Sequence, residues 1–265
     1  MNLAIDIHTH IDQHDSLELP GMLERSAAAG VGVIVIAGVT VESSKKAIAL
    51  AKEYEPIFAA VGAHPQDLTG PLSSDAETAL SKLAADPVVI AMSEIGLDFQ
   101  AASPDHKVQE EAFRIQIDIA RRNNLAVIWH MRAATVDCMR ILRDERVLEL
   151  GGAAHYFQGT WEDATAVMDL GCAISLAKPL LRLPELQEVA KRVPLASIVL
   201  ETDAYPQPFK KKRDKWTEPK DVAVVAEKLS QLKGCSVSEI IDQTTKNALE
   251  LLGQRGIPMR EQLEI

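Results

Sequence analysis

Residues 3–10 have the sequence LAIDIHTH, a short apolar run that ends in two histidines. Seven further runs rich in Val, Ile and Ala follow along the chain, and each ends in a polar or glycine-containing turn. Runs of this kind are typical of buried β-strands. We therefore expect eight strands, at Leu3–His8, Gly32–Gly38, Ile57–His64, Val88–Glu94, Ala126–His130, Gly152–Phe157, Cys172–Leu176 and Ile198–Asp203.

Amphipathic segments such as residues 43–55 and 108–123 separate these runs. Because strand and helix alternate eight times, and the strands are almost continuously apolar, we expect a parallel sheet covered by helices. The length of 265 residues favours a single TIM-type (β/α)8 barrel domain over residues 1–265, since such barrels typically have about 250 residues. An open doubly wound sheet is the alternative, although no GxGxxG sequence follows the first strand. A C-terminal helix, at about residues 236–252, is left over and should pack beside the barrel.

The composition indicates a globular protein with a full hydrophobic core, because 47% of the residues are hydrophobic and 25% are charged. The net charge of -10 repels polyanions, so any contact with nucleic acid must be local. Three widely spaced cysteines fit a reducing compartment. The longest apolar stretch, residues 31–39, is half the length of a membrane span. We therefore expect a cytoplasmic protein with no membrane contact and no obligate protein partner.

Ligand-type side chains gather at the predicted strand ends. In a barrel of parallel strands, the carboxyl ends of all strands meet at one rim, where active sites form. Four histidines end the first, third, fifth and sixth strands, one more lies just past the first, and two carboxylates end the fourth and eighth. These residues are His8, His64, His130, His155, His10, Glu94 and Asp203. The other two histidines, His14 and His106, fall outside this pattern.

Five imidazoles and several carboxylates at one barrel mouth would repel or lie unpaired unless cations hold them. Neutral imidazole together with carboxylate suits zinc, manganese or iron. We expect two divalent ions, with zinc, manganese and magnesium all open as their identity. One ion would be held by His8, His10 and Asp203, the other by His130 and His155, with Glu94 between them. Alternation along a strand also predicts that Asp6 shares one face with His8 and His10.

Six short motifs follow one another along the chain. They are Asp6-Ile7-His8-Thr9-His10, Gly62-Ala63-His64-Pro65, Ser93-Glu94-Ile95-Gly96-Leu97-Asp98, His130-Met131-Arg132, His155-Tyr156-Phe157 and Glu201-Thr202-Asp203-Ala204. With these motifs the sequence resembles the TatD family of metal-dependent hydrolases, within the amidohydrolase-like superfamily, over essentially the whole chain. The resemblance implies a TIM barrel with a two-metal centre and, in many members, deoxyribonuclease activity. Its implied metal ligands are His8, His10, Glu94, His130, His155 and Asp203.

The chain departs from the pattern of this family at several positions that leave the substrate open. Ser93 stands where a glycine is usual, Tyr156 where a cysteine is common, and Tyr205 where a proline usually follows Asp-Ala. The family's usual Arg-Asn-x-Pro segment is absent, and a basic run at residues 210–213 stands in that region instead. Because Tyr156 alternates away from His155, we expect it to pack against helices.

Each remaining candidate has a predicted role. Asp203 would act both as ligand and as proton acceptor from the attacking water, with Glu201 as a second candidate that a salt bridge inside the barrel explains equally well. His64 is expected to donate to a substrate oxygen, and Arg132 to hold a phosphate in a bidentate contact. The run of Lys210, Lys211, Lys212 and Arg213 would steer a phosphodiester into the mouth, although away from an active site such a run is usually a solvated loop.

Three functions are compatible with these features. The first is a two-metal phosphodiesterase acting on DNA, on single strands or ends, because no element is evident for reading a duplex groove. The second keeps the metals but cleaves a small amide, ester or lactone. The third is a non-catalytic metal-binding scaffold, which the complete ligand set disfavours.

Overall fold

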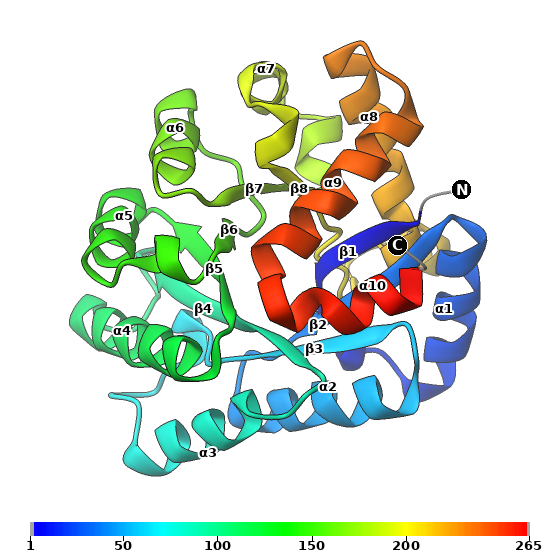
Figure 1. Ribbon diagram of the computed structural model, residues 1–265. Coiled ribbons are helices and arrows are strands. Elements are labelled where there is room, and N and C mark those ends of the chain that lie inside the picture. Colours follow the sequence, from blue (N-terminus) through cyan, green and yellow to red (C-terminus); the bar gives the residue numbers. More distant parts are fainter. Residues whose placement is uncertain (1–2, 264–265) are drawn as a thin grey trace.

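The computed structural model describes residues 3–263 and contains eight parallel strands that follow one another around a barrel (Figure 1). Each strand pairs in parallel with the next along the chain. All eight predicted strands are present, with ends that differ by a few residues. They are β1 (Ala4–Thr9), β2 (Val31–Ala37), β3 (Ile57–Val61), β4 (Val89–Asp98), β5 (Ala126–Arg132), β6 (Gly152–Ala154), β7 (Ala173–Leu176) and β8 (Ile198–Leu200).

Two backbone hydrogen bonds close the barrel between β1 and the segment that follows β8. The Asp203 N–H donates to the carbonyl oxygen of His8 at 3.0 Å, and the His10 N–H donates to that of Ala204 at 2.8 Å. The sheet is therefore not an open doubly wound one, and the predicted TIM-type barrel is confirmed. Closure occurs at the same residues that carry the candidate metal ligands of the first and last strands.

In the described part of the chain, eight helices surround the strands, and six of them start at a side-chain cap or a proline. Thr40 and Ser236, for example, form capping boxes before the second and ninth helices. No helix within residues 3–263 is long and apolar enough to cross a membrane. The surrounding helices are α1 (Leu19–Ala28), α2 (Val41–Glu53), α3 (Ser74–Ala84), α4 (His106–Asn123), α5 (Thr135–Asp144), α6 (Trp161–Asp169), α7 (Pro184–Arg192) and α8 (Val222–Lys233).

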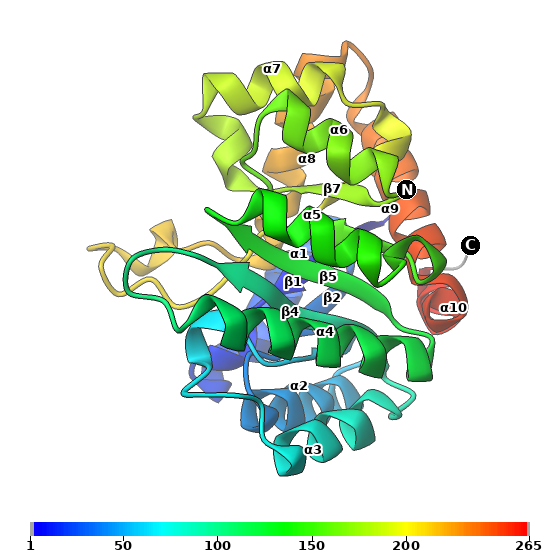
Figure 2. The ribbon, with the colours of Figure 1, turned by 90° about the vertical axis from the view of Figure 1, so that its left-hand side faces the viewer.

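Two further helices, α9 (Val237–Leu252) and α10 (Ile257–Leu263), cover the amino ends of the strands (Figure 1). Asn247 on α9 donates to the carbonyl oxygen of Ile198 at 2.7 Å, and Gln262 on α10 donates to that of Gly32 at 2.8 Å. The predicted C-terminal helix is thus confirmed as α9, whereas α10 is not anticipated by the sequence pattern. The carboxyl end of the barrel is left for the loops, and Figure 2 shows the loop after β8 projecting on the same side as the loop between β4 and α4.

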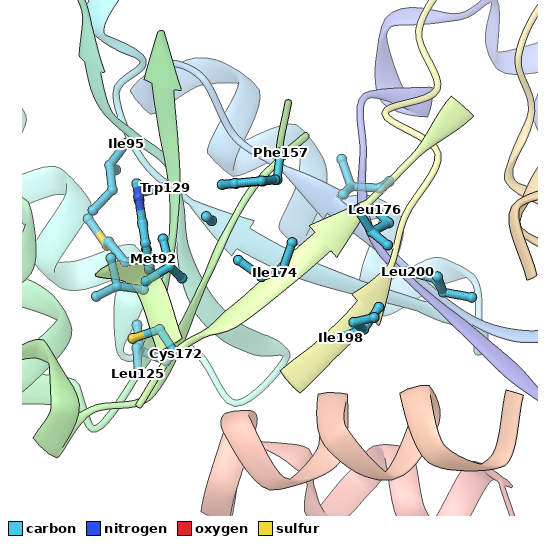
Figure 3. Packing of buried hydrophobic residues seen from close by; sticks show 14 of the residues in the cluster. Met92, Ile95, Leu125, Trp129, Phe157, Cys172, Ile174, Leu176, Ile198 and Leu200 are labelled. Atoms are coloured by element: carbon cyan, nitrogen blue, oxygen red, sulfur yellow. The ribbon is translucent and has the colours of Figure 1, made fainter. Parts of the chain in front are cut away.

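The core has two parts, one inside the barrel and one between the barrel and its helices. Inside lie alternate residues of the strands, such as Ile7, Val35 and Ile128, together with side chains of α9 and α10. Outside, residues such as Trp129 on β5 and Leu200 on β8 belong to a larger apolar cluster with the surrounding helices (Figure 3). This second cluster explains why the strands are apolar on both faces.

A β-bulge in β1 overturns one prediction. Asp6 pairs with Ile34 and Thr9 with Ile36, so three steps along β1 match two along β2. Strict alternation therefore fails, and the prediction that Asp6 shares a face with His8 and His10 is wrong. Its carboxylate instead accepts hydrogen bonds from the backbone N–H and the hydroxyl of Thr202. A bulge re-aims side chains in this way next to many active sites.

A second irregularity lies in β4, where Met92 pairs with Val127 and Ile95 with Trp129. Glu94 stands within this irregular stretch, and β4 continues four residues past it to Asp98. The expectation that Glu94 ends the fourth strand is therefore wrong. The longer strand places Asp98 next to Arg132 of β5, buried behind the mouth.

Candidate metal centre

Glu94 lies at the centre of the barrel mouth, and its two carboxylate oxygens face five imidazole nitrogens. The side chain is buried, with 6% of its surface exposed. Burial alone would raise its pKa, but the surrounding histidines hold that pKa well below the usual value, so Glu94 is ionised. The facing nitrogens are His10 Nε2 at 3.1 Å, His8 Nε2 at 3.6 Å, His130 Nδ1 at 2.9 Å, His64 Nε2 at 3.3 Å and His155 Nε2 at 3.5 Å.

The second nitrogen of four of these rings has a polar partner on the side away from Glu94, and in His10, His130 and His155 this partner is an oxygen that can only accept. Carbonyl and carboxylate oxygens only accept hydrogen bonds, so they fix the ring proton on the outer nitrogen and leave a lone pair on the nitrogen that faces Glu94. This is the arrangement of a metal-binding histidine. The outer contacts are His10 Nδ1 to Ala37 O (3.2 Å), His130 Nε2 to Asp98 Oδ2 (3.0 Å), His155 Nδ1 to Glu201 Oε2 (3.1 Å) and His8 Nδ1 to Ser93 Oγ (3.3 Å).

His64 has the opposite arrangement. Its Nδ1 accepts a hydrogen bond from the backbone N–H of Gln66 at 3.2 Å. In the neutral ring the proton must then lie on Nε2, which is the nitrogen that faces Glu94. His64 therefore presents an N–H donor to the mouth, whereas the other four rings can present a lone pair.

Asp203 completes the cluster on the side of β1. Its Oδ1 lies 3.5 Å from His10 Nε2, and its backbone has a φ of +51°, in the left-handed region that non-glycine residues seldom adopt. Burial raises the pKa of this carboxyl to about 6. A carboxylate with a pKa in this range can both bind a cation and accept a proton near neutral pH.

The imidazoles of the cluster differ widely in proton affinity. Burial lowers the pKa of His8 to about 4, so this ring is neutral at pH 7. Burial also opposes protonation of His10 and His155, but the neighbouring carboxylates raise their pKa values to about 9 and about 10. Perturbed pKa values of this kind gather at functional sites.

The donor set fits divalent cations. Three overlapping groups of side chains each place their ligand atoms within 4.8 Å of one another. All donors are imidazole nitrogens or carboxylate oxygens, which suits zinc or manganese and, for the carboxylates, magnesium. The groups are His8, His10 and Glu94; His64, Glu94 and His130; and His8, His155 and Glu201.

Glu201 lies behind the cluster. It is fully buried, and its carboxylate accepts from the Tyr156 backbone N–H at 2.8 Å and from the hydroxyl of Ser175, besides its contact with His155. It is absent from the lining of the open cavity. This position favours a role in orienting His155 over the predicted second role as proton acceptor.

A cavity of about 650 Å³ opens above the cluster and reaches the surface. Among the described residues, Arg132 supplies the one lysine or arginine side chain of its lining. Tyr156 also lines it, so the prediction that this tyrosine packs against helices is wrong. Because β6 ends at Ala154, the alternation of a strand no longer governs Tyr156, whose φ is +46°.

The basic run after β8 does not line this cavity. Lys210 donates to the side-chain oxygen of Gln207 at 2.7 Å, within its own loop. Arg213 donates to Glu18 at 2.6 Å and to Glu218 at 3.1 Å, which ties the loop after β8 to the loop after β1. Lys211 and Lys212 are exposed, and their ammonium groups make no ion pair with any residue in the described part of the chain.

The pattern of strand ends does not single out Asp98 or Ser93 as site residues. Both belong to the motif of residues 93–98 and contact ring nitrogens of the cluster. His14, outside the pattern, lies away from the cavity and contacts Glu18 at 3.2 Å.

Comparison with known proteins identifies the family. Residues 5–253 match the family model described as TatD related DNase. The chain belongs to the TatD family of metal-dependent hydrolases. It is 34% identical over 256 residues to the uncharacterized metal-dependent hydrolase YabD of Bacillus subtilis, across 94% of this chain and 98% of that protein.

Other TatD-family proteins agree in sequence and fold. The chain is 30% identical over 264 residues to the deoxyribonuclease TATDN3 of Homo sapiens, across 93% of each protein. The crystal structure of YJJV, a TatD homologue from Escherichia coli K12, superimposes with a TM-score of 0.85 at 29% identity, covering 94% of this chain and 97% of that one. Family membership, and with it a metal-dependent hydrolase, is therefore established for this chain.

Proposed function

We propose that this protein is a metal-dependent phosphodiesterase that cleaves DNA, preferably single strands or ends. The observation that carries the proposal is the convergence of four imidazoles on Glu94 at the mouth of the barrel, with Asp203 beside one of them, His10. The name of the human relative, a deoxyribonuclease, supports DNA as the substrate. Most of the candidate ligands line a cavity of about 650 Å³ rather than an open surface, which favours an unpaired strand over a duplex.

Two divalent ions would occupy the centre, one held by His8, His10 and Asp203, the other by His130 and His155, with Glu94 contacting both. When bound, such ions lower the pKa of a coordinated water towards about 7 and neutralise charge on a phosphoryl oxygen. Ala37, Asp98 and Glu201 keep three of the rings in the required tautomer.

Three side chains would handle protons and the substrate. Asp203, with its raised pKa, accepts the proton of the attacking water. His64 donates its Nε2–H to a nonbridging phosphate oxygen, since Gln66 holds the ring in that tautomer. Arg132, which lines the cavity with about half of its side chain exposed, binds the phosphate through its guanidinium group.

The loop after β8 would guide the strand. Lys211 and Lys212 are free to attract phosphates, whereas Arg213 is engaged by Glu18 and Glu218 and Lys210 by Gln207. We therefore assign steering to Lys211 and Lys212, and a structural role in the loop to Arg213. The exposed ring of Phe209 in the same loop offers a stacking surface for an unpaired base.

A nuclease assay tests this function. The purified protein, first stripped with a chelator and then supplied with manganese, zinc or magnesium, is offered labelled single-stranded and double-stranded DNA. We expect cleavage that requires metal, prefers the single strand and weakens as salt rises. Changing Lys211 and Lys212 to Ser should lower kcat/KM about tenfold and flatten the dependence on salt. No cleavage of either substrate with any of the metals would contradict the proposal.

A small uncharged substrate is the second candidate, because Arg132 is the one lysine or arginine among the described residues that line the cavity. The same metal centre would then hydrolyse an amide, ester or lactone. Turnover of small amides, esters or lactones that is unaffected by salt and by the Ser substitutions of Lys211 and Lys212 would favour this candidate. A metal-loaded protein without turnover on any substrate would indicate a binding scaffold.

A further inference from the structure

Asp98, the last residue of β4, is a buried carboxylate with a donor on each side. Its Oδ1 accepts from the backbone N–H of Gln100 at 3.0 Å and from the Ser103 hydroxyl at 3.1 Å. Its Oδ2 faces His130 Nε2 at 3.0 Å. A buried carboxylate needs such partners, and those of Asp98 come from the neighbouring strand β5 and from the loop that follows β4.

The backbone of Asp98 is fixed as well as its side chain. The Gln109 side chain, which is fully buried on α4, accepts from the Asp98 N–H at 2.8 Å and donates to the Asp98 carbonyl at 2.8 Å. The position of the carboxylate is therefore set by the scaffold before any ligand binds.

The contact with His130 determines which nitrogen of that ring is free. Because a carboxylate accepts but does not donate, it holds the ring proton on Nε2 and leaves the Nδ1 lone pair towards Glu94, 2.9 Å away. His64 shows the alternative, since a backbone N–H at its Nδ1 places the proton on the side of Glu94.

The same Oδ2 atom also lies 3.8 Å from the guanidinium group of Arg132. Arg132 is two residues beyond His130 on β5, so both side chains point to the same side of the strand. One carboxylate thus borders a candidate metal ligand and the arginine that lines the cavity.

We propose that Asp98 is a positioning residue that prepares His130 to bind metal and orients Arg132 towards the substrate. This inference rests on the proposed ligand set, and it adds a residue that touches neither the metal nor the substrate. It predicts that metal affinity and substrate affinity depend on a single side chain behind the mouth.

Metal titration of Asp98→Asn tests the inference directly. Asparagine keeps the shape but can turn an amide donor to the ring. Using cobalt(II) as the probe, we expect the affinity for one of two ions to fall about 10–100-fold, as is typical when an orienting partner is lost, and the absorption of that ion to change. KM for the substrate should rise by a larger factor than kcat falls. Ser103→Ala, which removes a donor from the other oxygen only, is the matched control and should keep the cobalt affinity within about twofold.

Two further measurements distinguish a failure of the role proposed for Asp98 from a failure of the proposed ligand set. In the zinc-loaded wild-type protein, nitrogen-15 NMR of the histidines should show the His130 proton on Nε2, a result that requires no variant to fold. A proton on Nδ1, or wild-type cobalt affinity in Asp98→Asn, would overturn the role of Asp98. If His130→Ala instead retains both ions, the proposed ligand set itself fails, which is a different result.

Discussion

The imidazole rings of His8 and His155 are stacked, with their centroids 3.6 Å apart and their planes 24° apart. Both rings are buried. Burial and the neighbouring His155 lower the pKa of His8 to about 4, whereas the carboxylates around His155 outweigh burial and raise its pKa to about 10. The His8 ring therefore stays neutral at pH 7 and can offer a lone pair to a cation. A cation that binds this buried ring in the folded protein would stabilise the fold.

Metal removal should destabilise the protein for this reason. We expect the melting temperature to fall when a chelator is added and to recover with zinc or manganese. At a free concentration of about one hundred times Kd, each independent site contributes about 2.7 kcal/mol to the free energy of unfolding. Scanning calorimetry with and without metal measures the effect, and an unchanged melting temperature at saturating metal would count against the centre.

His10→Ala should reduce the bound metal from two ions per chain to one or none and abolish turnover. A loss greater than a hundredfold is expected, since removing a group that only orients a ligand already costs about 10–100-fold. The fold should persist, because the barrel is closed by backbone groups at this position. His14→Ala is the control; elemental analysis should find its metal content equal to that of the wild type.

Gly96→Ala should destabilise the centre and the fold together. Gly96 has a φ of +135°, and a Cβ there would lie 2.1 Å from the carbonyl oxygen of His130. Overpacking and backbone strain together predict a loss of about 2–4 kcal/mol in the free energy of unfolding. Gly70→Ala, where no atom lies within 4 Å of the added Cβ, should change it by less than about 1 kcal/mol. Chemical denaturation compares the two; equal stabilities would refute the packing argument.

The ion-pair network that anchors the loop after β8 predicts a dependence of stability on pH. Burial would raise the pKa of Glu218, but hydrogen bonds from Arg25 at 2.7 and 2.9 Å and the other nearby cations lower it below its usual value of 4.5. A lowered pKa in the folded state stabilises the protein fully above about pH 4.5, and this contribution is lost as the pH falls through the folded pKa.

Glu218→Gln should therefore lower the free energy of unfolding by about 1–3 kcal/mol at pH 7 and reduce its decline below pH 4.5. Glu24→Gln on the exposed side of α1 is the control, with an expected change below about 0.5 kcal/mol. Denaturation curves from pH 3 to 7 provide the comparison. A decline of the same steepness in Glu218→Gln and the wild type would contradict the assignment to this carboxylate.

The sequence was sufficient to predict the barrel and the meeting of the candidate ligands, for one physical reason. All parallel strands of a closed barrel end at one rim. Residues far apart in the sequence, such as His8 and Asp203, must therefore lie close to each other when each stands at the end of its strand. The predictions that failed depend on hydrogen-bond register instead. Bulges turned Asp6 away and placed Glu94 inside a longer strand, and neither is encoded by the local alternation of polar and apolar residues.

Contacts between distant loops were also beyond prediction from the sequence. By its position in the sequence, Arg213 belongs to a basic run of the kind usually found in solvated surface loops. In the structure it donates a hydrogen bond at 2.6 Å to Glu18, which is 195 residues away. Asp98 is similar, because its importance depends on a neighbouring strand supplying His130 rather than on any spacing within its own segment. Such partners become visible only when the strands are placed side by side.

The most direct test of the account is anomalous diffraction from a crystal grown with saturating manganese. We predict two peaks, one on each side of Glu94, the first contacting His8, His10 and Asp203 and the second contacting His130 and His155. Ordered side chains that point apart around a mouth without any anomalous peak would contradict it.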